Sequence, residues 1–164
     1  EPPRISISPI VTTGDEVRLN AALLLFQNSV KNIEPLGKGY NYKYVKLDQL
    51  YTELRRIAEQ FNILIQQFFT TPDTNNISMV TKISWVDCPL KPTKTATLSF
   101  TSNMFFDLKT EKQKGIQLCG SAKTYLSRYV LGTFFMIGTE HDDDGEAVSG
   151  QRMTRKPDFN APRS

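Results

Sequence analysis

Two segments in the middle of the chain alternate between apolar and polar residues, and this pattern restricts the fold more than any other feature. Within residues 77–86, Ile77, Ile83 and Trp85 share one side with Met and Thr, and Ser and Lys take the other. Residues 95–101 alternate Ala, Leu and Phe with Thr and Ser. Such alternation predicts strands with one core face and one Ser/Thr/Lys-rich face. Residues 63–70 (ILIQQFFT), followed by the turn-forming PDTNN, predict a third strand, and hence an antiparallel meander.

A long helix is predicted after these strands, beginning near Gln117. At about 100° per residue, its apolar side would carry Leu118, Cys119, Ala122, Tyr125, Leu126, Tyr129, Val130, Met136 and Ile137. A second line, at i, i+4, i+7 and i+11, would carry Gln117, Ser121, Thr124 and Arg128. Amide, hydroxyl and guanidinium groups can bond phosphate oxygens without reading base sequence. The alternative is that this line is only the solvated side of an amphipathic helix.

The remaining sequence predicts one α+β domain with N-terminal helices. Residues 15–33 and 47–61 have helical spacing of apolar residues, and Pro35 and Gly37 end the first helix. Residues 1–13 are Pro- and Ser-rich and are interpreted as an extended arm, residues 14–148 as the core domain, and residues 149–164 as a flexible basic tail.

The composition is that of an ordinary globular protein with uneven charge. Apolar residues make up 39% and charged residues 23%, and the formal net charge is +3. Without the five carboxylates of residues 140–146, the remainder carries about +8, which fits a polyanionic partner. An excess of lysine that only aids solubility is the alternative. Because no apolar run of membrane length, signal peptide or metal-spaced cysteine pair occurs, we expect a location in the cytoplasm of a cell.

Three tyrosines interleaved with lysines form a second polar motif. In GYNYKYVK, Tyr40, Tyr42 and Tyr44 accompany Lys43 and Lys46. Aromatic faces accept any base, and lysines can follow a phosphate backbone, so the motif is typical of a platform for single-stranded nucleic acid. The alternative is that alternate tyrosines are core residues of a short strand or extended loop. In a strand, Tyr42 and Tyr44 would share one side and Lys43 would point to the other.

Both motifs resemble a known family. The run GSAKTYLSRYVL followed by HDDDG, and the upstream GYNYKYVKLDQL, are similar to signatures of the Erf family of phage single-strand annealing proteins. The resemblance covers residues 14–148. Ser127 departs from it, because the family usually has the first of two arginines there, so Arg128 supplies the single guanidinium.

The resemblance implies a fold and a function. The fold would be a β-β-β-α annealing-protein core, with the polar sheet face and the long helix bracketing a groove. The function would be ATP-independent binding and annealing of single-stranded DNA in homologous recombination, by a homo-oligomeric ring or filament that contacts the nascent duplex in a bacterial host. No nucleotide cofactor and no membrane partner are expected. The predicted DNA-binding residues are Tyr42, Lys43, Tyr44, Lys46, Gln117, Ser121, Lys123, Thr124 and Arg128.

The acidic block leaves several alternatives open. Asp142, Asp143 and Asp144 could form a solvated linker, a weak ion site, a partner for a basic surface of a neighbouring subunit, or a Mg²⁺-dependent nuclease site. Contiguous aspartates lack the alternating spacing of a calcium loop, and one histidine, His141, gives little basis for His-based catalysis or zinc. We therefore expect no enzyme and no metal cofactor. The rival functions are the nuclease and a non-enzymatic protein-interaction module.

Overall fold

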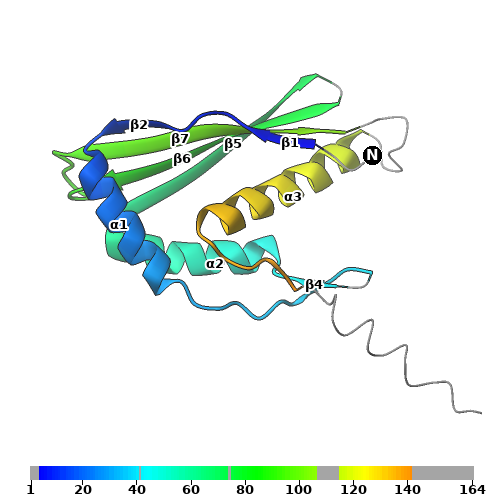
Figure 1. The fold of residues 1–164 in the computed structure, drawn as a ribbon, viewed down its shortest axis with the longest axis horizontal. Coiled ribbons are helices and arrows are strands. Elements are labelled where there is room, and N and C mark those ends of the chain that lie inside the picture. Colours follow the sequence, from blue (N-terminus) through cyan, green and yellow to red (C-terminus); the bar gives the residue numbers. More distant parts are fainter. Residues whose placement is uncertain (1–3, 41, 74, 107–114, 142–164) are drawn as a thin grey trace, which may run out of the picture.

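The computed structural model describes residues 4–40, 42–73, 75–106 and 115–141. These residues form an α+β fold in which an antiparallel sheet lies on one side and the three helices lie on the other (Figure 1). The expected α+β class is therefore confirmed. No helix within these ranges has both the length and the apolarity needed to cross a bilayer.

The large sheet is built around three strands of eleven residues each. β5 (Ile63–Asp73), β6 (Asn76–Val86) and β7 (Thr95–Phe105) pair antiparallel in chain order, with Ile65 opposite Ile83 and Ile83 opposite Leu98. Their alternation places one set of side chains against the helices. The buried set on β6 and β7 is Ile77, Met79, Thr81, Ile83, Trp85, Ala96, Leu98, Phe100, Ser102 and Met104. The alternation therefore predicted the core face.

Two further strands extend this sheet beyond the expected three. β1 (Arg4–Ile7) and β2 (Val11–Gly14) both pair antiparallel with β7. The segment expected as an extended arm is thus extended but hydrogen-bonded to the sheet. Gly14 ends β2 with a φ of 83°, where a Cβ would collide with the carbonyl oxygen of Thr95. The order β1-β7-β6-β5 leaves β5 at the end of the described sheet.

A short loop joins β6 to β7, and several of its groups donate hydrogen bonds to the carboxylate of Asp87. The hydroxyl of Thr93 donates to Asp87, and the backbone N–H groups of Thr93 and Cys88 donate to the same carboxylate at 2.9 Å. These hydrogen bonds, with that of the Thr93 hydroxyl the largest cause, hold the pKa of Asp87 well below its ordinary value. The loop therefore has a defined shape although Leu90 at its tip is exposed.

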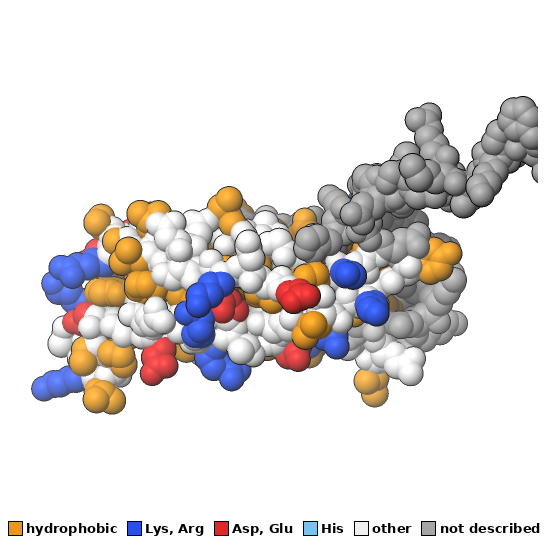
Figure 2. All heavy atoms as spheres, turned by 90° about the horizontal axis from the view of Figure 1, so that it is seen from below, with side chains coloured by type: hydrophobic (Ala, Val, Ile, Leu, Met, Phe, Trp, Pro, Cys, Tyr) orange, Lys and Arg blue, Asp and Glu red, His pale blue; other side chains and the backbone are white. Residues whose placement is uncertain are grey.

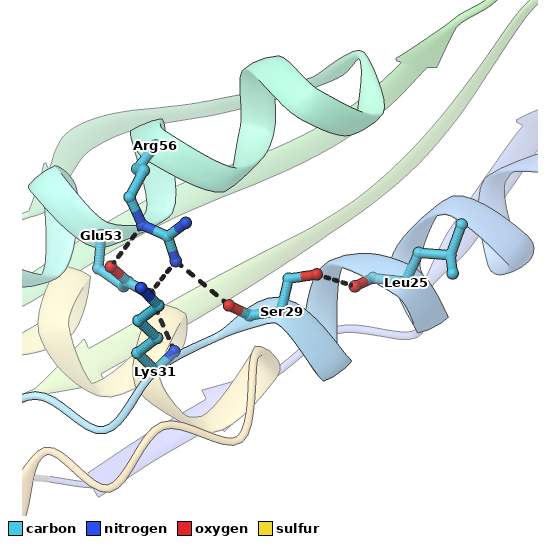
Figure 3. Close-up of polar contacts among 5 residues, drawn as sticks. All are labelled: Leu25, Ser29, Lys31, Glu53 and Arg56. Atoms are coloured by element: carbon cyan, nitrogen blue, oxygen red, sulfur yellow. Dashed lines mark hydrogen bonds and ion pairs between the residues drawn. The ribbon is translucent and has the colours of Figure 1, made fainter.

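The helices α1 (Glu16–Ser29) and α2 (Leu47–Ala58) are joined by a polar junction (Figure 3). The Arg56 guanidinium donates to both carboxylate oxygens of Glu53, at 2.7 and 3.0 Å, and to the carbonyl oxygen of Ser29 at 3.2 Å. The Lys31 backbone N–H donates to Glu53 at 2.9 Å. The hydrogen bond from Arg56 is the main reason that the pKa of Glu53 lies below its ordinary value. The junction fixes the end of α1 against α2.

The long helix α3 (Ile116–Phe134) lies between the large sheet and α2 (Figure 1). Leu126 is fully buried, and the Ser127 hydroxyl lies 3.7 Å from the sulfur of Met79 on β6. The 3₁₀ turn η1 (Glu59–Phe61) leads from α2 into β5. Because α3 packs on the apolar side of the sheet, the expectation that it brackets a groove with the polar side is wrong.

A small sheet forms beneath α3 from segments far apart in sequence. β3 (Gly37–Lys38) pairs with β4 (Lys43–Tyr44), and β4 pairs with β8 (Glu140–His141). The chain reaches β8 through a tight turn at the end of α3, where Met136 has a φ of 55° and the Ile137 N–H donates to the carbonyl oxygen of Gly132 at 2.8 Å. A Cβ on Gly132 would crowd Thr139. This turn returns the chain to the hairpin.

Candidate nucleic-acid interface

The rings of Tyr42 and Tyr44 in the hairpin pack over glycines. A Cβ on Gly37 would collide with the ring of Tyr44, and one on Gly39 would collide with the ring of Tyr42. Glycine in a strand leaves space over the backbone that a cross-strand aromatic ring can fill. The two rings lie 5.9 Å apart, so both tyrosines share one side of the hairpin, as their spacing predicted. The hairpin therefore presents aromatic surface rather than a packed core strand.

Arg128 connects the two sequence motifs. Its guanidinium carbon lies 4.5 Å from the centre of the Tyr44 ring, and the residue is only 8% exposed. A guanidinium stacks on aromatic faces and is less strongly hydrated than an ammonium group, which makes such burial tolerable. The interpretation of Arg128 as part of a solvated line is wrong, because the small sheet covers that side of α3. The motif residues Tyr44 and Arg128 nevertheless meet.

Tyr125 and Tyr129 extend this contact along α3. Their rings lie 6.1 Å apart and nearly parallel, and the Arg128 guanidinium lies 5.8 Å from the Tyr125 ring. Both tyrosines were predicted on the apolar side, yet they are 36% and 43% exposed, and Met136 is 78% exposed. The core contacts of α3 are made by Leu118, Ala122, Leu126, Val130 and Leu131 instead. We call Tyr42, Tyr44, Tyr125, Arg128 and Tyr129 the tyrosine–arginine cluster.

The remaining polar line of α3 is exposed but does not contact the cluster through any described interaction. Gln117, Ser121 and Thr124 are exposed, in agreement with their predicted position. The hydroxyl of Thr124 donates to the carbonyl oxygen of Gly120 at 3.0 Å, which leaves its oxygen able to accept. These side chains form a polar surface on the half of α3 nearer its N-terminus. Their role in binding stays a prediction.

The lysines lie on several elements. Lys43 and Lys46 are exposed on the hairpin and at the start of α2, whereas the Lys123 ammonium lies 4.7 Å from the centre of the Phe69 ring on β5. Figure 2 views the side on which α2 and β4 lie, and basic and acidic side chains are interspersed there. Positive charge on this side therefore comes from separate cations, some of which lie beside aromatic rings.

The acidic block begins beside the hairpin but is not itself described. β8 pairs with β4 so that Glu140 lies opposite Tyr44 and His141 lies opposite Lys43. Asp142, Asp143 and Asp144 lie outside the described residues. Within those residues, no group of three or more His, Cys, Asp or Glu side chains is placed to hold a metal ion.

Sequence reasoning missed three aromatic residues that make contacts on or beside α3. Tyr125 and Tyr129 were assigned to the core, although their i, i+4 spacing with Arg128 between them could have indicated an aromatic–cation pair on one helix surface. Phe69 was missed because it belongs to a strand whose alternation is weak near its end. The contact of Phe69 with Lys123 joins distant segments, which periodicity does not encode.

The cluster combines groups suited to a nucleic-acid strand. Tyrosine rings can stack on bases, and the Arg128 guanidinium places a positive charge beside the rings of Tyr44 and Tyr125.

Comparisons with known proteins agree with the sequence resemblance. A model of the ERF superfamily matches residues 19–162, a range that includes both motifs, α3 and the strands β5, β6 and β7. Neither the curated proteins nor the solved structures gave a match. On the strength of the family match, which covers most of its length, the chain belongs to the ERF superfamily.

Proposed function

We propose that this protein binds single-stranded DNA and anneals complementary strands without ATP or metal, in phage-type recombination within a bacterial cell. Membership of the ERF superfamily points to an annealing-type function in recombination. The observation that carries this proposal is the contact between Arg128 and Tyr44, which brings the two motifs together beside the exposed rings of Tyr42, Tyr125 and Tyr129. The strands β5–β7 and α3 would be the β-β-β-α core of such annealing proteins.

The proposed mechanism needs no covalent step. Stacking of a base on a tyrosine contributes roughly 1–3 kcal/mol and accepts any base. Arg128 and the exposed Lys43 and Lys46 would offset phosphate repulsion. Pairing energy, roughly 1.4 kcal/mol per base-pair step, would then drive duplex formation.

Annealing of long strands also calls for repeated subunits, and α1 offers a surface for this purpose. Val17, Leu24 and Leu25 are exposed on it, at 80%, 59% and 53%. Exposed apolar residues gathered on one helix are typical of protein contacts. We propose this surface of α1 as part of a contact between copies in a ring or filament.

The test is oligonucleotide binding by Arg128 variants. Fluorescence anisotropy over a salt series should give a slope of about −0.7 per neutralised phosphate in log K against log [salt], with little dependence on base composition. Arg128→Ala should weaken binding about tenfold and reduce the slope by about 0.7. Arg55→Ala, which removes an exposed arginine of α2 outside the cluster, is the matched control.

Because Arg128 is buried, a second variant separates binding from folding. Arg128→Lys keeps the charge but loses the planar stacking on Tyr44, so it should bind more weakly than wild type while retaining its circular-dichroism melt. A salt-independent affinity, or equal affinities for Arg128→Ala and Arg55→Ala, would exclude this site. Incubation of complementary labelled strands with and without Mg²⁺ tests the nuclease alternative, since shortened products would replace the proposal of annealing alone.

A further inference from the structure

The side of the large sheet that faces away from the helices carries few carboxylates. We call it the outer sheet face. No described helix covers it (Figure 1). Across the five strands of this sheet the one carboxylate is Asp73, at the end of β5, where it accepts the Asn75 backbone N–H at 3.0 Å. A surface with hydroxyls, a lysine and a single carboxylate at one end suits an anionic partner.

An aromatic–cation pair lies on this face near the edge of the sheet. Phe68 is 53% exposed and Leu64, on the same strand and face, is 51% exposed. The Lys82 ammonium of β6 lies 5.9 Å from the centre of the Phe68 ring. Gln66, between the two apolar residues, lies opposite Lys82. An exposed ring on a sheet beside a lysine is an arrangement that stacks bases and contacts phosphate.

The next residue along β5 has the same arrangement on the opposite face. Phe69 points to the helix side because adjacent side chains of a strand alternate, and the Lys123 ammonium lies 4.7 Å from its ring. Phe68 and Phe69, at the edge of the sheet, therefore each lie beside a lysine ammonium group, and the two pairs are on opposite faces. The α3 side belongs to the proposed site for the first strand.

From this arrangement we propose that the outer sheet face, centred on Phe68 and Lys82, binds the second, incoming single strand. β5 would then lie between the two DNA strands, and both DNA strands would be close to the edge of the sheet. This inference rests on the proposed function, because a second strand has meaning only for a protein that anneals.

The test compares two double variants that each lose one exposed apolar residue and one lysine. Phe68→Ala with Lys82→Ala removes the pair on the outer sheet face. Leu90→Ala with Lys91→Ala, in the exposed β6–β7 loop, is the matched control. The protein is first saturated with a donor-labelled oligonucleotide. An acceptor-labelled non-complementary strand then reports capture by energy transfer, and a complementary strand reports the annealing rate.

The outer-face variant should bind the first strand within about twofold of wild type, because Phe68 and Lys82 lie on the opposite face of the sheet from α3. Its capture of a second strand and its annealing rate should fall about tenfold, whereas the control should match wild type. Unchanged capture and annealing would overturn the inference, and so would a changed assembly mass, which would make this face a contact between subunits. If wild type itself binds no strand, the proposed function fails; if wild type anneals and the variant equals it, the inference alone fails.

Discussion

The two sheets of this molecule are stabilised in different ways. The large sheet has strands of eleven residues whose alternating side chains fill a core under three helices. The small sheet has strands of two residues, and its tyrosine rings lie over glycines and against Arg128. One sheet is held by apolar burial along its whole length, and the other by a few stacked groups. The proposed binding surface therefore lies on the part with the fewest supporting contacts.

The largest effect should come from the core beneath the large sheet. Phe26 of α1 is fully buried and stacks on Phe135, with ring centres 4.7 Å apart. Phe26→Ala should lower the free energy of unfolding by about 3–5 kcal/mol, measured by urea denaturation. Asn28→Ala, at an exposed position of the same helix outside the proposed contact between copies, should change it by about 0.5 kcal/mol or less. Similar losses in both variants would mean that α1 is not packed as described.

A smaller and local effect should follow from filling the space under Tyr44. Gly37→Ala places a methyl group against that ring and should cost about 1–3 kcal/mol, mainly by opening the small sheet. Hydrogen exchange should show faster exchange of the Val45 amide, which bonds to Thr139 at 2.8 Å. Gly138→Ala is the control, because nothing lies within 4 Å of its added Cβ. If the Val45 amide exchanged as slowly as in wild type, the packing of the Tyr44 ring over Gly37 would be contradicted.

The stability that the polar junction between α1 and α2 provides should depend on pH. The folded pKa of Glu53 is lowered, so its contribution is present above the ordinary value of 4.5 and is lost as the pH falls through the folded pKa. Glu53→Gln should therefore destabilise by about 1 kcal/mol at neutral pH and by progressively less in acid. Denaturation at pH 7 and at pH 3 measures the difference. Gln60→Ala, a neutral substitution at an exposed position after the same helix, should show no such dependence.

The smallest effect concerns the turn into β8. Met136 is exposed and has a φ of 55°, a conformation that glycine adopts without steric cost. Met136→Gly should raise the free energy of unfolding by about 0.5 kcal/mol, because relief of backbone strain exceeds the added entropy of the unfolded chain. A small rise in melting temperature would show it. A decrease would indicate that the Met136 side chain makes stabilising contacts.

The contrast between the sheets also explains what the sequence could predict. The alternation in β6 and β7 gave the core face, because the period of a strand is local information. The environment of Arg128 could not be predicted in the same way. Its burial depends on β3, β4 and the turn after α3, which are joined by contacts between distant segments. The spacing placed Tyr125 and Tyr129 on an apolar side, although the sheet contacts α3 through other residues.

The pairing of β4 with β8 affects the order in which parts of the fold form during synthesis of the chain. Tyr44 and Glu140 are neighbours in the small sheet but are separated by about 96 positions in the chain, a separation that makes closure late and entropically costly. On the ribosome, the large sheet can be complete while the partner of the hairpin is still untranslated. A growing chain would therefore have its large sheet before its tyrosine–arginine cluster, and would complete that cluster only when the last described residues emerge.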